Sequence, residues 1–464
     1  MTVAVLDLGK TNAKLSAVSP EGAVLEQVST PNRVLDGPPY RHHDFAGLEA
    51  WLLAALADLA RRHPIEAIVP TAHGGSGVLV GADGPALPMV DYEGPLPDDV
   101  ASAYRTAADD FHERGGSPIM LGAAHAARQL LWFEREWPEA LAGATAYLYT
   151  PQYWSWRLCG IAASEVTSAA AQSHLWCAPE GRPAAIVARR GWQRLLPPLR
   201  PAWATLGPIR PEIAARTGLD PATRVVCGIH DSSANFYRYQ AAGLEDLTVI
   251  STGTWIVALT DRPGVDFIHE RAGWSCNADV SGRPVPGMLT MGGREFSAVA
   301  DGAAGPADRA TLARLVASDT LALPFFAQDD GLAPGRAGQG RVEGPLAGDP
   351  AARFSLAVLY AALLTAEILD ALPPARTVVL DGNFVRDPLY GALVQRLHPE
   401  ADVRVNPDSH GISAGAALLA HHEIRTAPAA LALARPDTAD LPDLAAYRAR
   451  WRATLTAAPA GAQT

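Results

Sequence analysis

The sequence predicts an α/β protein built from two duplicated domains, and three observations support this prediction. The chain has 464 residues, more than one hydrophobic core usually serves. Segments with helical and strand-like periodicity alternate along it. A strand, a glycine turn and a second strand occur at 3–18 and again 244 residues later, at 247–259. Because such a repeat indicates duplicated domains, we expect one domain in residues 1–242 and the other in 243–464.

The first hairpin has the residue types of a phosphate site. A glycine turn between strands directs successive backbone N–H groups into one concavity, which suits phosphate, and the carboxylate of Asp7 suits a phosphate-bound Mg²⁺. Lys10 and Lys14 are the only lysines among 38 lysine and arginine residues. An ordinary hairpin with exposed cations is the alternative. The residues expected to contact phosphate are Gly9, Lys10, Thr11, Asn12 and Lys14.

The second half of the chain should hold the same nucleotide through its own hairpin, if the domains are duplicated. Gly382 and Asn383 follow a predicted strand at 377–380, where a base and ribose could lie flat against the backbone. Gly415 lies in a similar segment, for which helix packing is the alternative explanation. The contacts expected from the second hairpin are Ser251, Thr252, Gly253 and Thr254.

Three loops and segments of the first half carry residues expected to bind a second substrate. A buried strand at 65–70 runs into His73 and Gly74, and ligands of open α/β sheets bind beyond the carboxyl ends of the strands. A flexible turn with a surface histidine fits the same spacing. We expect another short strand at 89–94, which contains Tyr92.

Trp154 belongs to a segment dense in aromatic residues, at 147–156. Aromatic rings with polar tips can stack on the faces of a sugar, although such clusters more often form core.

Asp231 is the best candidate for a general base. The residues at 224–229 predict a buried strand, and His230 and Asp231 open a helix directly after it. A carboxylate at this junction can accept a proton, whereas capping the helix N-terminus is its structural alternative.

Composition excludes several classes of function. The 38 cationic and 49 anionic side chains give a net charge of −11 without a basic tract, which argues against nucleic acid or an anionic membrane as partner. The four cysteines form no Cys-x-x-Cys pair, so neither a zinc ribbon nor a disulfide framework is indicated. No signal peptide and no uncharged apolar stretch of about 18 residues is found. We therefore expect a soluble, cytoplasmic protein.

Taken in order, these motifs resemble those of the FGGY carbohydrate kinases, within the superfamily of actin, hexokinase and the 70-kDa heat-shock ATPases. The residues at 7–14 resemble the first phosphate motif, those at 251–255 the second, and those at 228–231 the catalytic segment. The stretch at 153–168 resembles the characteristic segment of the first domain. The C-terminal match is poorer, because Asp381-Gly382-Asn383 stands where the family usually has a glycine pair.

The resemblance implies two duplicated ribonuclease H-like domains of the actin and hexokinase type around a central cleft. It also implies ATP-dependent phosphorylation of a sugar hydroxyl, with Asp231 as base and Asp7 holding Mg²⁺. His73, Gly74, Tyr92, Trp154 and His230 would bind the sugar, and a homodimer is left open. The pair His230-Asp231 with the second hairpin is most similar to the kinases of L-rhamnulose and L-fuculose, which are 6-deoxyketoses.

Two alternatives stay open at this point. The first is a kinase for another sugar or polyol, such as xylulose, ribulose or glycerol. The second is a non-catalytic protein of the same ATPase fold, such as a sugar-sensing regulator or a chaperone-like switch. The chain has no evident room for a DNA-binding segment or a client domain, so the kinase interpretation is favoured.

Overall fold

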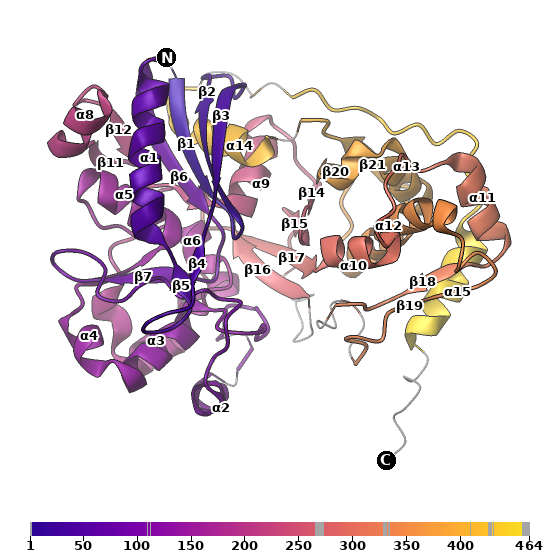
Figure 1. Ribbon diagram of the computed structural model, residues 1–464, viewed down its shortest axis with the longest axis horizontal. Coiled ribbons are helices and arrows are strands. Elements are labelled where there is room, and N and C mark those ends of the chain that lie inside the picture. Colours follow the sequence, from indigo (N-terminus) through magenta and orange to yellow (C-terminus); the bar gives the residue numbers. More distant parts are fainter. Residues whose placement is uncertain are drawn as a thin grey trace. The chain divides into compact units, whose positions relative to one another are not determined.

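The computed structural model describes residues 2–108, 110–111, 113–264, 273–327, 332, 335–408, 410–425, 429 and 431–456. The chain divides into two compact units (Figure 1). Unit 1 comprises Met1–Leu244, Cys276–Val285 and His410–Leu431, and unit 2 comprises the remaining segments Glu245–Ser275, Pro286–Ser409 and Ala432–Thr464. The first change of unit therefore falls two residues after the boundary expected at 242, while two later segments pack with unit 1 again.

Unit 1 is organised around a seven-stranded sheet with the order β11-β12-β6-β1-β2-β3, in which β13 also pairs with β6. The central strand β1 is buried along its whole length, because cores pack on both of its faces. Ala4 and Leu6 belong to one core, and Val3 and Val5 to the other, as the two-residue period of a strand requires. The strands are β1 (Thr2–Leu8), β2 (Asn12–Val18), β3 (Val24–Pro31), β6 (Ile65–Ala72), β11 (Thr205–Pro208), β12 (Arg224–Val226) and β13 (Ile229–His230).

Helices cover both faces of this sheet. The core that includes Leu6 also contains residues of α1 and α5, whereas the core that includes Val5 contains residues of α9 and α14. The helices of unit 1 are α1 (Phe45–Ala60), α2 (Asp98–Ala107), α3 (Ala126–Glu136), α4 (Pro138–Gly143), α5 (Thr150–Cys159), α6 (Val166–Ala170), α7 (Ala185–Arg190), α8 (Pro211–Thr217), α9 (Asp231–Ala241) and α14 (Gly411–Leu419).

A third core in unit 1 surrounds α3 and the two-stranded pair β7 (Gly77–Val80) and β8 (Ala146–Tyr149). Two further pairs are β4 (Val34–Leu35) with β5 (His42–His43), and β9 (Trp176–Cys177) with β10 (Arg182–Pro183). The strand expected at 89–94 is wrong, because only Val90 forms a bridge, to His42, and the chain turns at Asp91.

Unit 2 repeats the arrangement around a six-stranded sheet with the order β16-β17-β15-β14-β20-β21. Like β1 in unit 1, β14 lies between an antiparallel hairpin partner, β15, and a parallel strand, β20. The strands of this sheet are β14 (Leu247–Thr252), β15 (Ile256–Thr260), β16 (Trp274–Ala278), β17 (Pro284–Thr290), β20 (Thr377–Gly382) and β21 (Asp402–Val405), and the segment Cys276–Val285, which packs with unit 1, includes parts of β16 and β17. The strands β18 (Leu321–Leu323) and β19 (Arg341–Glu343) form a separate pair.

The helices of unit 2 pack around α12 (Arg353–Ala371), most of whose residues are buried. Within the described residues one helical segment, Pro350–Ala371, is long and apolar enough to cross a membrane. Its most apolar stretch of 18 residues is 72% buried inside the protein, as expected for a core helix. The other helices are α10 (Gly292–Ala300), α11 (Arg309–Ala317), α13 (Pro388–Leu397) and α15 (Ala445–Thr456).

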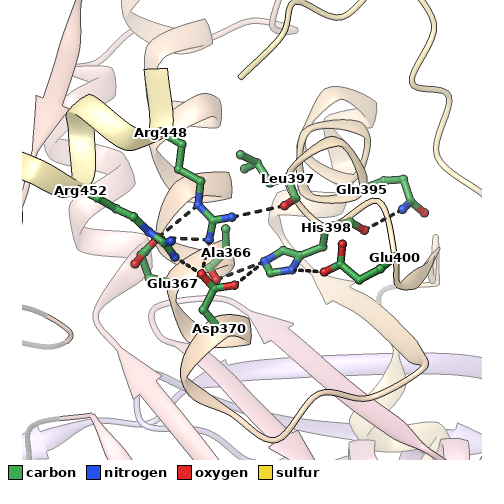
Figure 2. A network of polar contacts seen from close by, with 9 residues as sticks. All are labelled: Ala366, Glu367, Asp370, Gln395, Leu397, His398, Glu400, Arg448 and Arg452. Carbon is green, nitrogen blue, oxygen red and sulfur yellow. Dashed lines mark hydrogen bonds and ion pairs between the residues drawn. The ribbon is translucent and has the colours of Figure 1, made fainter. Parts of the chain in front are cut away.

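The last helix, α15, contacts α12 through ion pairs and buries a tryptophan ring. Figure 2 shows Arg448 and Arg452 pointing toward Glu367 and Asp370, with Arg448 Nη2 2.8 Å from Asp370 Oδ2 and Arg452 Nε 2.6 Å from Glu367 Oε1. Trp451 is fully buried and donates to the carbonyl of Ala322. Burial of this ring, more than the partly exposed ion pairs, should hold the helix in place.

Candidate active site

The first hairpin places a buried carboxylate at the end of the central strand of unit 1. Asp7 lies opposite Lys14 in the β1–β2 ladder, and Lys14 Nζ is 3.8 Å from Asp7 Oδ2. Burial raises the pKa of Asp7 to about 6, although Lys14 lowers it, and the negative charge of Asp231 raises it further. The charge of Asp231 is therefore close enough to affect the carboxyl group of Asp7.

The hairpin turn itself is open to solvent. The N–H of Gly9 donates to the carbonyl of Asn12 at 3.0 Å, and the side chains of Thr11 and Asn12 are exposed. Asn32 supports the turn from the next strand, because its side-chain amide donates to the carbonyl of Gly9. The backbone N–H of Asn32 also donates to the carbonyl of Thr11 at 2.8 Å, so Asn32 holds the turn at two points while the side chains of Thr11 and Asn12 stay exposed to a ligand.

Lys10 is not directed at the turn but bound to a second buried carboxylate. Its ammonium forms an ion pair with Asp91 and lies 5.6 Å from the centre of the Tyr92 ring. Arg41 binds the other carboxylate oxygen of Asp91 at 2.7 Å. Burial opposes ionisation of Asp91, yet the hydrogen bonds from Lys10 and Arg41 lower its pKa overall. Asp91 was not among the predicted site residues, although an acid beside Tyr92 in an apolar segment was a usable signal.

His73 and Tyr92 lie together, as predicted, with 5.1 Å between their ring centroids. His73 Nδ1 is 3.1 Å from the carbonyl of Gly74, which can only accept, so Nδ1 carries the hydrogen. Burial lowers the pKa of His73, and the neutral ring then presents Nε2 as an acceptor. At Gly74 a Cβ would lie 2.6 Å from atoms of Ala171, which explains why this loop carries a glycine.

Asp231 begins α9 directly after the short strand β13, which parallels β6. Its Oδ1 accepts from the backbone N–H of Ser232 at 2.5 Å and from the Ser232 hydroxyl at 3.2 Å, and the ring nitrogen Nε2 of His230 lies 3.2 Å away. In the described part of the chain no protein group donates to Oδ2. One carboxylate oxygen is thus held by the protein and the other is left for a ligand.

The strand expected at 224–229 is interrupted before Asp231. Gly228 has φ of +90°, and a Cβ there would lie 2.4 Å from the carbonyl of Pro70, so the chain bends where only glycine fits. The bend separates β12 from β13 and directs the start of α9.

Trp154 does not belong to this site, and its assignment to sugar binding is wrong for this structure. The ring is completely buried in the core between α1 and α5, where it packs on Phe45 and Tyr153. The core alternative for the aromatic segment holds for this residue, since no ligand can reach the ring without opening the core.

Unit 2 contains a pocket of about 790 Å³ beside the turn of the second hairpin. Its walls are aromatic, because Phe296 stacks on Phe384 with 5.1 Å between ring centroids and meets Phe354 edge to face at 5.6 Å. Such a slot suits a flat heteroaromatic ring. Three predicted residues line it, Gly253, Thr254 and Asn383.

The remaining predicted residues of the second hairpin have supporting positions. Thr252 donates to the carbonyl of Asp381 at 2.7 Å and accepts from the N–H of Phe384 at 3.0 Å, which fixes the loop after β20. Gly382 has φ of +95°, and a Cβ would lie 2.0 Å from the Thr252 carbonyl. Ser251 is half-buried within β14, opposite Val257. These residues shape the pocket wall that carries Asn383.

Gly415 lies in α14 of unit 1, where a Cβ would lie 1.9 Å from the carbonyl of Ala234 in α9. The glycine is required for the close packing of two helices, as the alternative explanation had it, and the structure gives it no role in a nucleotide site.

Comparison with known proteins identifies the fold that carries these sites. The model for the FGGY family of carbohydrate kinases, N-terminal domain, matches residues 2–236, and the model for Carbohydrate kinase FGGY, C-terminal domain, matches residues 244–428. Among solved structures, a carbohydrate kinase from Novosphingobium aromaticivorans is 32% identical, with a TM-score of 0.85 over 97% of this chain and 100% of that one.

Two further similarities are more distant. A ligand-bound xylulose kinase from Lactobacillus acidophilus has a TM-score of 0.77 over 98% of this chain and 96% of that one, but at 15% identity it shows the fold alone. The L-fuculokinase of Escherichia coli (strain K12) is 26% identical over 299 residues, so the match spans 62% of the length of this curated relative and 62% of this chain. Both domain models match in order and together span most of the sequence, and the chain therefore belongs to the FGGY family of carbohydrate kinases.

Proposed function

We propose that the protein transfers the terminal phosphate of ATP to a hydroxyl group of a ketose, with Asp231 as general base. The observation that carries this proposal is the asymmetry of the Asp231 carboxylate, whose Oδ1 accepts from the N–H and hydroxyl of Ser232 and lies 3.2 Å from His230 Nε2, while Oδ2 is left open. A base needs one oxygen to hold its orientation and another to accept the proton.

In the proposed reaction Oδ2 takes the proton of the sugar hydroxyl as the sugar oxygen attacks the γ-phosphorus. The new bond joins that oxygen to phosphorus, the bond from phosphorus to the bridging oxygen breaks, and ADP leaves with the electron pair. His73 Nε2 can accept a hydrogen from a neighbouring sugar hydroxyl, and the Tyr92 ring can cover a face of the sugar. These side chains orient the hydroxyl, which is the main contribution a protein makes to phosphoryl transfer.

The nucleotide is proposed to bind with its base in the aromatic pocket of unit 2. Phe296, Phe354 and Phe384 would enclose the base, and Thr254 and Asn383 supply polar contacts at the pocket wall. In this proposal the phosphates are bound by the turns that contain Gly9 and Gly253. Lys10 is paired with Asp91, so Lys14, which lies 3.8 Å from Asp7, is the cation of the first hairpin that we propose to contact phosphate.

Mg²⁺ fits the residues present through Asp7. The described residues contain no cluster of three or more His, Cys, Asp or Glu side chains that could hold a metal alone. Mg²⁺ is commonly bound by one or two carboxylates, with water and substrate phosphates as the other ligands, and Asp7 is such a carboxylate. When bound, the ion would neutralise charge on the phosphate oxygens.

Replacing Asp231 by Asn tests the base. The variant keeps the shape of the side chain but cannot accept a proton, so kcat should fall by about 10² to 10⁴ while sugar and ATP affinities persist. Asp220→Asn is a matched control, because Asp220 caps a turn in the same unit through the N–H of Ala222. If Asp231→Asn turned over near the wild-type rate, Asp231 would not be the general base and would only cap the start of α9.

The sugar we propose is a 6-deoxyketose of the L-fuculose or L-rhamnulose type. Support comes from the curated relatives, which are named L-fuculokinases, and from His230 beside the base. One buried methyl or methylene group is worth roughly 1 to 3 kcal/mol, so kcat/KM should exceed that for a hydroxylated analogue by about tenfold to a hundredfold. Side-by-side kinetics that favoured D-xylulose, D-ribulose or glycerol would replace the substrate but keep the kinase. A cytoplasmic location and a homodimeric assembly stay predictions.

A further inference from the structure

We propose that Glu165 and Thr167 form a buried relay that positions the catalytic segment at His230 and Asp231. The inference rests on the proposed role of Asp231 as base. It concerns residues that lie in a different element, the short helix α6 and its cap, and that touch neither proposed substrate.

Glu165 is a completely buried carboxylate that receives four hydrogen bonds from the first turn of α6. Its Oε1 accepts from the N–H of Thr167 at 2.9 Å, and its Oε2 accepts from the Thr167 hydroxyl at 2.7 Å and from the N–H and hydroxyl of Ser168 at 2.9 and 3.1 Å. No cation of the described structure pairs with it, and burial raises its pKa. Capping a five-residue helix needs fewer donors and no complete burial.

The hydroxyl of Thr167 has only one arrangement that satisfies both of its partners. The backbone N–H of His230 lies 3.1 Å from Thr167 Oγ1 and can only donate, so the hydroxyl accepts there. Its own hydrogen must then be the one given to Glu165 Oε2. The two hydrogen bonds of Thr167 therefore have fixed directions: the His230 N–H donates to Thr167, and Thr167 donates to Glu165.

This peptide is a place where the sheet gives little support. The strand is broken at Cys227 and Gly228, and β13 contains only Ile229 and His230. On the other side of the break, Gln152 and Ser155 of α5 donate to the carbonyls of 226–228. The segment that leads to Asp231 is thus tied by side chains from two helices where ladder bonds are missing.

A movement of the His230 peptide would also move the side chain of Asp231, the proposed base. The ring nitrogen of His230 lies 3.2 Å from Asp231 Oδ1, and Asp231 is the next residue, at the first position of α9. A rotation at His230 therefore changes both the partner of Oδ1 and the direction of Oδ2. Misplacement of a reacting group by about 1 Å can cost on the order of a hundredfold in rate.

The test compares Thr167→Val, Thr167→Ser and Thr217→Val in the full-length protein. Valine removes the hydroxyl at constant shape, and serine keeps it. Thr217 is the matched control, since it is also buried in unit 1 and its hydroxyl donates only to carbonyls of its own helix. Thermal unfolding is measured first, and both valine variants should lose a similar small amount of stability.

We expect Thr167→Val to lower kcat by about tenfold to a hundredfold with little change in KM for sugar or ATP. Thr167→Ser should restore most of kcat, and Thr217→Val should keep it. Glu165→Gln, which places an amide donor against other donors, should reproduce the loss of Thr167→Val.

The outcomes separate the relay from the proposed function. If Asp231→Asn is inactive but Thr167→Val keeps the kcat of Thr217→Val, the relay is overturned and the base is kept. If Asp231→Asn is itself active, the proposed function fails before the relay is at issue. A Thr167→Val protein that unfolds leaves Thr167→Ser and Glu165→Gln to decide, and a fully active Glu165→Gln would also overturn the relay.

Discussion

The hairpins β1–β2 and β14–β15 share their strand pairing but differ in the charges they carry. In unit 1, Asp7 lies opposite Lys14, and the second strand of the hairpin, β2, also pairs with β3. In unit 2 the corresponding pair is Ser251 opposite Val257, and no lysine is present. The first hairpin thus pairs two charged side chains, as the proposed binding of metal and phosphate requires, whereas the corresponding pair of the second hairpin carries no charge.

The same difference appears in the side chains around each turn. Near the first turn lie the buried acid Asp91 and the partly buried Asp231, together with two histidines. Near the second turn lie three phenylalanine rings and a pocket of about 790 Å³. The two units thus share the strand pairing of the hairpin but not its surroundings, which fits the proposed division between catalysis in unit 1 and binding of the nucleotide base in unit 2. The following predictions test that division.

Replacing Asp7 by Asn should have the largest effect among the hairpin variants. The substitution removes the charge proposed to hold Mg²⁺, and metal stabilisation of phosphate charge is worth several kcal/mol, so kcat/KM should fall by about 10² or more. Raising the Mg²⁺ concentration should recover part of the loss. Ser251→Ala, at the corresponding position, removes no charge and should cost about tenfold or less. Equal losses for the two variants would contradict the division.

Replacing Gly253 by Val should weaken ATP binding without harming the fold. A Cβ at Gly253 would meet no heavy atom within 4 Å, whereas one at Gly9 would lie 3.2 Å from the Asn12 carbonyl. Valine at 253 therefore enters open space beside the pocket and blocks backbone donors, at a cost of about tenfold or more in affinity. Valine at 9 should in addition lower the melting temperature.

Calorimetric titration with ATP and thermal unfolding measure the two effects. Gly348→Val is the control in unit 2, because Gly348 is equally open and does not line the pocket. Unchanged ATP affinity in a folded Gly253→Val variant would remove the second hairpin from the nucleotide site.

Local signals explain what the sequence predicted well. The hairpins, the helix at α12 and the junction at Asp231 follow from two-residue or helical periodicity and from glycine turns, which need only neighbouring residues. The confirmed family membership depended on the order of these same motifs.

The wrong assignments depended on partners far away in the sequence. Trp154 has the residue type of a sugar platform, and only its packing on Phe45 shows that it is core. Gly415 follows a pattern seen at ligands, yet the atom that requires it belongs to Ala234. The aromatic pocket was missed because Phe296, Phe354 and Phe384 come from three separate segments. The periodicity of the sequence shows which face of a helix or strand is apolar, but it does not show which residues pack against that face.

Lys14 provides the smallest and most specific test of the charged hairpin. Asp7 must be ionised to hold Mg²⁺, so kcat/KM for ATP should decline as the pH falls through about 6. Lys14 lowers the pKa of Asp7 from 3.8 Å away, and Lys14→Met should therefore raise it. Because the lysine is partly exposed and its charge is screened by solvent, we expect the shift to be small.

The sign of this shift distinguishes Asp7 from other titrating groups. An acid whose pKa rises loses its charge at a higher pH, so the acidic limb of the Lys14→Met profile should move toward neutral pH. Lys14→Arg keeps the positive charge and should leave the limb in place. At pH 8, where Asp7 stays ionised in each variant, any remaining loss in Lys14→Met measures the phosphate contact alone. A limb that stays at the same pH in Lys14→Met would show that Asp7 is not the group that titrates, and the charged hairpin would then contribute through phosphate binding without a metal carboxylate.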